Sequence, residues 1–194
     1  MPDPTLWGLF AVASVVLLLT PGPAVLYIVA RSIERGRAAG LVSVLGIHLA
    51  TIVHITAAAV GLSALIVSSA LAFAVVKYLG AAYLIWIGIR TFMAKNPDPE
   101  MPAVPAEPLS RVFRDGFVVN LFNPKTAIFF LAFLPQFIDP ARGALAWQIL
   151  VLGLTFMGLG MISDGTYALL AGTVGNTLRR NPRFLRFQRW FAGT

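Results

Sequence analysis

Long apolar runs with few charged side chains decide what this chain can fold into. A helix of about 20 residues crosses the roughly 30 Å hydrocarbon core of a bilayer. Runs of at least this length cover about residues 6–30, 40–67, 71–92, 112–138 and 145–177. Only 12% of the residues are charged, whereas soluble domains carry about a quarter. The sequence therefore predicts an all-α, polytopic membrane protein, a helical bundle with five complete spans.

The segments between the runs are too short to form a second domain. The stretch at about residues 95–110 is rich in proline and acid and is predicted to be a linker on the cytoplasmic side. From about residue 184 aromatic residues alternate with arginines, a pattern typical of an interfacial segment whose arginines reach the lipid headgroups. This pattern is interpreted as the start of a sixth span, and residues 1–194 are predicted to be a single transmembrane domain.

The distribution of basic residues predicts the orientation in the membrane. Of the 15 lysines and arginines, twelve fall in the first, third and fifth connections between the spans. These twelve are Arg31, Arg35, Arg37, Arg90, Lys95, Arg111, Arg114, Arg179, Arg180, Arg183, Arg186 and Arg189. Because basic loops stay in the cytoplasm, the N-terminus is expected outside. The same distribution explains the net charge of +7 without a nucleic-acid partner.

Two of the runs are interrupted by matching proline motifs. Thr20-Pro21-Gly22-Pro23 lies in the first run and Asn123-Pro124-Lys125 in the fourth, about a hundred residues apart. In each motif a residue with helix-capping chemistry precedes a proline, which is favoured at the first position of a helix. A single motif of this kind is equally compatible with a proline kink. Two in corresponding places predict broken helices at the binding site of a transporter.

The two halves of the chain are predicted to form a 3+3 inverted repeat. Three spans per half is an odd number, so the second half inserts upside down relative to the first. The half-helices that restart at the two breaks then begin near mid-membrane and point their N-termini at one central space. Unsatisfied amide groups and the helix dipole favour an anion there. We therefore expect the carboxylate of a substrate to bind between Thr20, Pro21, Gly22 and Pro23 on one side and Asn123, Pro124 and Lys125 on the other.

Lys125 and two further ionisable residues are predicted to belong to this central layer. A cation in the first turn of a helix calls for a nearby anion, either a substrate carboxylate or the protein's own acid. Apart from Asp115 at the cytoplasmic end of the fourth span, Asp164 is the only acidic residue inside a span, and His48 lies at a similar depth when residues are counted from the cytoplasmic side. Intramembrane ionisable residues are costly, so Asp164 and His48 are candidates for ion coupling. The alternative is a buried hydrogen-bonded pair without proton traffic; His54 is interpreted as a packing residue.

Other functional classes find little support. The chain has no cysteine, two histidines and few acidic residues inside the spans, so no metal or cofactor is expected. A membrane-embedded hydrolase would need a nucleophile and a base, yet the sequence contains no nucleophile-elbow motif. We expect no enzyme. The remaining alternative is a pore or scaffold subunit that has no transport cycle.

Several motifs resemble the lysine-exporter (LysE/RhtB) family of amino-acid efflux proteins. They are the two proline motifs, Gly36-Arg37-Ala38-Ala39-Gly40, Lys77-Tyr78-Leu79-Gly80 with Gly88, Phe113-Arg114-Asp115-Gly116, Asn120-Leu121-Phe122 and Phe133-Leu134-Pro135-Gln136-Phe137. The resemblance implies a dimeric exporter of amino acids in the bacterial inner membrane, driven by the proton-motive force. It places the family's proline motifs at the seven residues of the two breaks. It also implies a complete sixth helix, which this chain is expected to lack.

The residues after the second break suggest the kind of amino acid. The fourth span carries no acidic residue beyond Asn123 that could pair with a cationic side chain. A neutral side chain, similar to that of threonine or homoserine, is therefore predicted. Asp164 could serve as such a counter-ion, so a cationic side chain stays open as an alternative.

Overall fold

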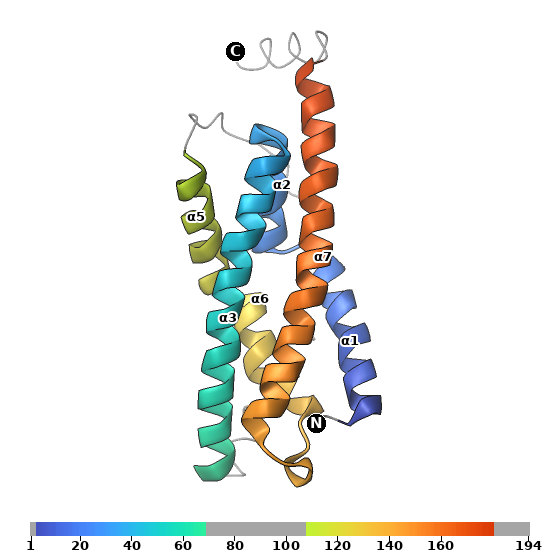
Figure 1. Cartoon of the computed structure of the whole chain (residues 1–194), viewed down its shortest axis with the longest axis vertical. Coiled ribbons are helices and arrows are strands. Elements are labelled where there is room, and N and C mark those ends of the chain that lie inside the picture. The colour runs from blue at the N-terminus through green and yellow to red at the C-terminus, as the bar shows by residue number, and fades with distance from the viewer. Residues whose placement is uncertain (1–2, 69–107, 181–194) are drawn as a thin grey trace.

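The computed structural model describes residues 3–68 and 108–180, and these residues form helices and connecting turns only. The long helices are α1 (Pro4–Leu19), α2 (Pro23–Arg35), α3 (Arg37–Ser68), α5 (Leu109–Leu121) and α7 (Leu145–Arg180) (Figure 1). Short helix α6 (Pro124–Ile128) continues into the π-helical turn Phe129–Phe133 and the 3-10 turn Leu134–Phe137, and a second 3-10 turn covers Pro140–Arg142. The predicted third span, most of the linker and the start of the sixth span lie outside the described residues.

The predicted first and fourth spans are both broken. Helices α1 and α2 meet at an angle of 52°, and α5 meets the segment Pro124–Phe137 at 48°. Within the described residues, α3 and α7 are continuous and apolar enough to cross a membrane over Arg37–Gly61 and Leu145–Gly175, and the two bent pairs raise the number of candidate spans to four. The five-span count and the 3+3 repeat stay predictions.

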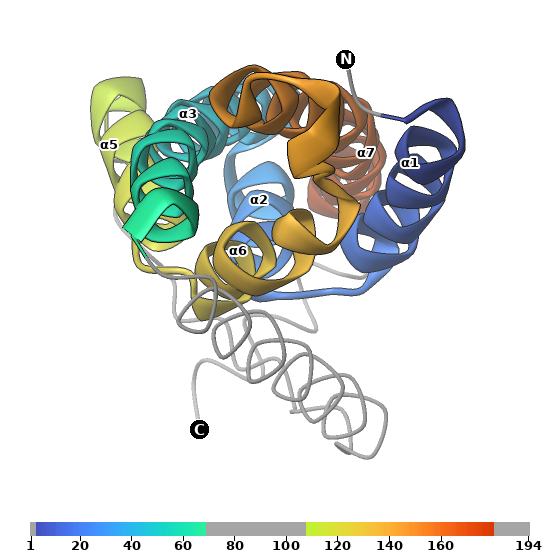
Figure 2. The ribbon, with the colours of Figure 1, turned by 90° about the horizontal axis from the view of Figure 1, so that it is seen from below.

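The half-helices that follow the breaks run in opposite directions. In Figure 1, α2 leads from the first break towards the top of the view, whereas α6 leads from the second break towards the bottom. Seen along the bundle (Figure 2), α5, α3, α7 and α1 follow one another around α2 and α6. Both restarts therefore lie in the middle part of the bundle (Figure 1), on one side of the two continuous helices α3 and α7 (Figure 2).

Small residues allow the helices to approach closely around this middle part. A Cβ atom at Gly46 of α3 would collide with the backbone carbonyl of Phe113 in α5, and one at Gly116 would come within 3.0 Å of the carbonyl oxygen of Ser43. On the other side, Gly153 of α7 packs on Ile55 of α3. Close helix contacts through small residues are the usual means of packing in membranes.

Aromatic residues fill the bundle below the second break. Phe129 lies at the centre, with ring centroids 4.3 Å from Phe156, 5.1 Å from Phe133 and 5.7 Å from Phe10. These residues come from α1, from α7 and from the turn after α6, and the Phe10, Phe129 and Phe156 side chains are buried. The cluster anchors the second broken helix to the continuous helix α7.

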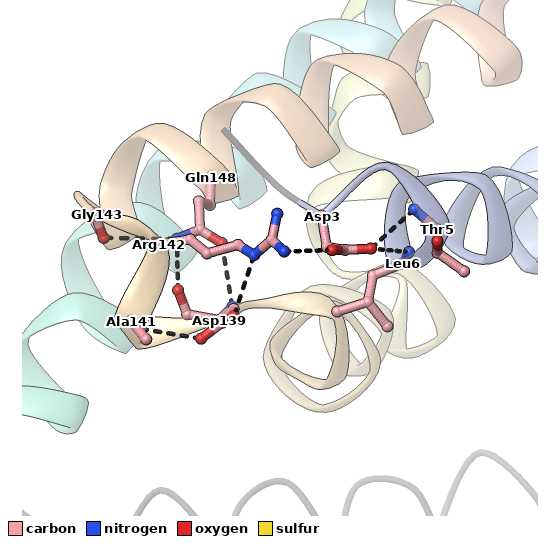
Figure 3. Close-up of polar contacts among 8 residues, drawn as sticks. All are labelled: Asp3, Thr5, Leu6, Asp139, Ala141, Arg142, Gly143 and Gln148. Carbon is pink, nitrogen blue, oxygen red and sulfur yellow. Dashed lines mark hydrogen bonds and ion pairs between the residues drawn. The ribbon is translucent and has the colours of Figure 1, made fainter.

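A polar network ties the start of α1 to the turn before α7 (Figure 3). The Asp3 carboxylate accepts hydrogen bonds from the backbone N–H groups of Thr5 (2.9 Å) and Leu6 (3.3 Å), and it pairs with Arg142 at 2.7 Å. The two backbone bonds, and then the arginine, hold the pKa of Asp3 below its ordinary value of 3.8. A lowered pKa means that this stabilisation is complete above pH 3.8 and is lost as the pH falls through the lowered value.

Candidate functional site

At the first break the chain ends one helix, runs extended and restarts at a proline. Thr20 closes α1, and its hydroxyl donates to the carbonyl of Val16 at 2.9 Å. Gly22 is the N-cap of α2 and Pro23 is its first residue. The expectation that Thr20 caps the restarting helix is therefore wrong: its hydroxyl bonds backwards, and Pro21 and Gly22 separate it from α2.

At the second break the predicted capping geometry is confirmed. Asn123 is the N-cap of α6, and its side-chain oxygen accepts the backbone N–H of Lys125 at 3.1 Å. Pro124 occupies the first position of the helix. An asparagine cap followed by proline is among the strongest helix starts, because each satisfies or removes an amide that would otherwise lack a partner.

A cavity lies between the two breaks and the continuous helices. Among the residues expected at the site, Gly22, Asn123, Lys125, His48 and Asp164 line it. Thr20, Pro21, Pro23 and Pro124 are not among the lining residues. The remaining lining residues are Leu17, Leu18, Ala24, Val25, Ile47, Thr51, Asn120, Thr126 and Phe156. The structure thus brings both breaks and the two ionisable residues of α3 and α7 to one space.

The cavity is small in this state. Its volume is about 40 Å³, and a buried water molecule needs about 10–15 Å³ on this measure. The space is therefore large enough for a few water molecules and too small for a molecule of amino-acid size.

Lys125 finds its partners at the end of α1. Its Nζ donates to the carbonyls of Leu17 at 2.6 Å and Thr20 at 2.5 Å. A Cβ atom at Gly22 would lie 3.2 Å from Lys125 Cδ, so the lysine chain runs past the glycine of the first break. The two partners weighed from the sequence, a substrate carboxylate and a protein acid, omitted the helix carbonyls that bind this ammonium group here.

His48 and Asp164 form a buried pair across the cavity. His48 Nε2 lies 3.2 Å from Asp164 Oδ2, and both side chains are almost fully shielded from solvent. Neither Nδ1 nor Nε2 of His48 makes a hydrogen bond within the described residues, so the contact with Asp164 is one of proximity. The pairing inferred from depth counting alone is thus a direct contact between α3 and α7.

Gly160 makes room for this pair, one helical turn before Asp164. A Cβ atom there would lie 2.8 Å from His48 Cε1, whereas one at Gly158 would have no neighbour within 4 Å. We expect Gly160→Ala to displace the imidazole and to lower the free energy of unfolding by about 1–3 kcal/mol, the usual cost of overpacking. The matched variant Gly158→Ala should show no loss. Thermal unfolding of both purified variants checks this, and equal melting temperatures would contradict it.

Asn120 is the residue that the sequence analysis missed. Its side-chain amide donates to Ile47 O (2.8 Å) and Thr51 Oγ1 (3.0 Å), and its oxygen accepts from Thr126 Oγ1 (2.9 Å) and Asn123 Nδ2 (3.3 Å). These bonds hold the second break against α3. The available signal was its spacing, since Asn120 lies one helical turn before Asn123 in an apolar run where a polar side chain is costly.

Two aromatic side chains contact backbone carbonyl groups at the C-terminal ends of α5 and α1. His54 Nε2 lies 3.0 Å from the carbonyl oxygen of Asn120, and its ring stacks on Phe130. Tyr167 of α7 donates to the carbonyl of Leu19 at 3.2 Å. His54 is therefore a hydrogen-bonded packing residue, in agreement with its interpretation from the sequence.

Comparison with known proteins assigns the family. The family model of the LysE type translocator matches residues 15–193. The chain is 36% identical over 165 residues to the homoserine/homoserine lactone efflux protein of Salmonella typhimurium, covering 85% of this chain and 80% of that protein. It is 32% identical over 150 residues to the leucine efflux protein of an Enterobacter species, covering 75% and 70%. A membrane protein of Vibrio cholerae without an assigned function shares 32% identity over 190 residues, covering 97% and 92%.

The chain belongs to the LysE type translocator family. It is thereby a membrane protein of a family of amino-acid efflux transporters rather than an enzyme. No solved structure matches the chain.

Proposed function

We propose that this protein exports amino acids with a neutral side chain, or their close derivatives, out of the bacterial cytoplasm by alternating access. One observation carries the proposal: residues of both helix breaks line a single cavity together with residues of α3 and α7. Discontinuous helices that meet near the middle of the membrane are the usual binding sites of secondary transporters. The N-terminus outside the cell and a homodimer belong to the same proposal.

The names of the relatives narrow the substrate class. Homoserine and leucine have neutral side chains, and homoserine lactone carries an α-ammonium group but no free carboxylate. An α-ammonium group is therefore the charge common to all three. Apolar side chains of Leu17, Val25, Ile47 and Phe156 in the cavity wall suit an uncharged side chain. The first turns of α2 and α6 and Lys125 supply partners for a carboxylate where one is present.

Export driven by the proton-motive force is tested by efflux from intact cells. Cells loaded with labelled L-homoserine or L-leucine should release it faster when they produce this protein, and the rate should saturate with internal concentration. An uncoupler should remove the difference. A pore or scaffold subunit, the alternative function, would show a non-saturating release or none, and either result would contradict the proposal.

The His48–Asp164 pair is the proposed route for coupling to protons. A buried histidine next to a carboxylate can take up a proton while the cavity opens to one side of the membrane and release it when the cavity opens to the other side. In proteoliposomes, Asp164→Asn should lose at least about nine-tenths of transport driven by a pH gradient while it keeps exchange of internal for external substrate, since coupling groups act on the driven step. If the pH gradient drives transport by Asp164→Asn at the wild-type rate, Asp164 is not the coupling group.

A further inference from the structure

The carbonyl end of α1 presents a site for an ammonium group. The last carbonyls of a helix have no partner within the helix and carry its partial negative charge. Here Leu17 O and Thr20 O converge on one point next to the cavity, 2.6 Å and 2.5 Å from the Nζ atom of Lys125. The structure therefore shows directly that these two oxygens bind a primary ammonium.

The ammonium that occupies this site is attached to a movable side chain. Lys125 belongs to the first turn of α6, where the helix dipole disfavours a cation. Its chain crosses from α6 to α1 past Gly22, which offers no side chain to hold it. Lys125 also lines the cavity, and so does Asp164. The lysine is thus placed to leave α1 when a competing ammonium group arrives.

We propose that Leu17 O and Thr20 O bind the α-ammonium group of the substrate, and that Lys125 fills this subsite only while the cavity is empty. The inference rests on the proposed function, because it requires an amino-acid substrate. On binding, the substrate ammonium takes the two carbonyls and Lys125 turns to the substrate carboxylate. A zwitterion brings one charge of each sign, so every charge stays paired through the exchange. The withdrawal of the lysine also enlarges a cavity that is otherwise too small.

A small amine tests the subsite without any transport. In the purified, detergent-solubilised Lys125→Ala variant the two carbonyls are open, so methylammonium chloride at about ten times its Kd should raise the melting temperature by roughly 4 °C over equal potassium chloride. Lys125→Met is the matched control, because its side chain fills the same space without a charge. Neither it nor the wild type should respond. Equal responses in all three proteins, or no response in Lys125→Ala, would overturn the proposal.

A competition experiment on the wild type needs no variant. L-leucinamide has the ammonium group without the carboxylate, and N-acetyl-L-leucine has the carboxylate without the ammonium. Against export of labelled L-leucine, N-acetyl-L-leucine should compete about ten- to a hundred-fold more weakly than leucine, the loss expected for a charged hydrogen-bonding group. L-leucinamide should compete better than N-acetyl-L-leucine, and the reverse order would overturn the proposal.

The two experiments separate this inference from the proposed function. Stabilisation of Lys125→Ala alone by methylammonium, in a protein that exports no amino acid, would remove the export function and retain the ammonium site. Saturable export together with the reverse competition order would retain the function and remove the site.

Discussion

Export by the Lys125→Met variant is expected to fall to the level of cells without the protein. Methionine matches the length of the lysine chain but donates no hydrogen bond, so Thr20 O loses its ammonium partner and Leu17 O keeps only the backbone N–H of Thr20 at 3.2 Å. Buried polar groups without a partner are costly in a membrane, and the substrate would also lose a cation that pairs with its carboxylate. Efflux of labelled amino acid from preloaded cells measures the effect, with the amount of inserted protein determined in the same cells.

The matched control removes a cation that does not line the cavity. Arg114 lies on α5 with an exposed side chain that pairs with its neighbour Asp115. Exposed ion pairs contribute little, so Arg114→Met should keep export near the wild-type rate. Normal export by Lys125→Met, at equal membrane levels, would show that Lys125 has no part in the transport site.

Replacing Asn120 by leucine is expected to cause the largest loss of stability among the changes considered. The variant removes four side-chain hydrogen bonds that join α3, α5 and α6 at a buried position. Hydrogen bonds between membrane helices contribute about 0.6 kcal/mol on average and up to about 1.7 kcal/mol. The free energy of unfolding should therefore fall by about 2–4 kcal/mol, and export should fall with it, because the second break is no longer held against α3.

Thr126→Val provides the graded comparison. Its hydroxyl makes one of the four bonds, to Asn120 Oδ1. The single change should cost about 0.6 kcal/mol, and in the Asn120→Leu background it should cost almost nothing, since the partner is already gone. Denaturant unfolding of the purified single and double variants measures the free energy of unfolding of each. If the losses of the two single variants add up in the double variant, Asn120 and Thr126 do not act through a shared hydrogen bond.

Much of the architecture could be predicted because it depends on side-chain chemistry. Apolar runs mark the spans, and a proline motif marks each break, so the bent pairs were predicted at the correct positions. The second break matches its prediction in detail because Asn123 and Pro124 act through their own side chains. The first break does not. Thr20 can bond to either side, and only the fold decides that it bonds to Val16.

The partner of Lys125 could not be predicted from the sequence for a different reason. Its partners are backbone carbonyls of Leu17 and Thr20, and every residue carries a carbonyl, so no residue type marks them. The contact of His48 with Asp164 could be predicted, because ionisable residues are rare in membrane spans. The role of Asn120 depends on four partners, two from α3 and two from the start of α6, and only the spatial arrangement brings them together.

Export by variants of the two breaks shows whether both breaks build one substrate site. Labelled L-homoserine or L-leucine is followed in its release from preloaded cells that contain equal amounts of wild type, Pro21→Ala or Pro124→Ala. We expect saturable release by the wild type that an uncoupler abolishes, and background release by both variants, because each proline interrupts the helix at its break. Wild-type export by either variant would contradict the claim.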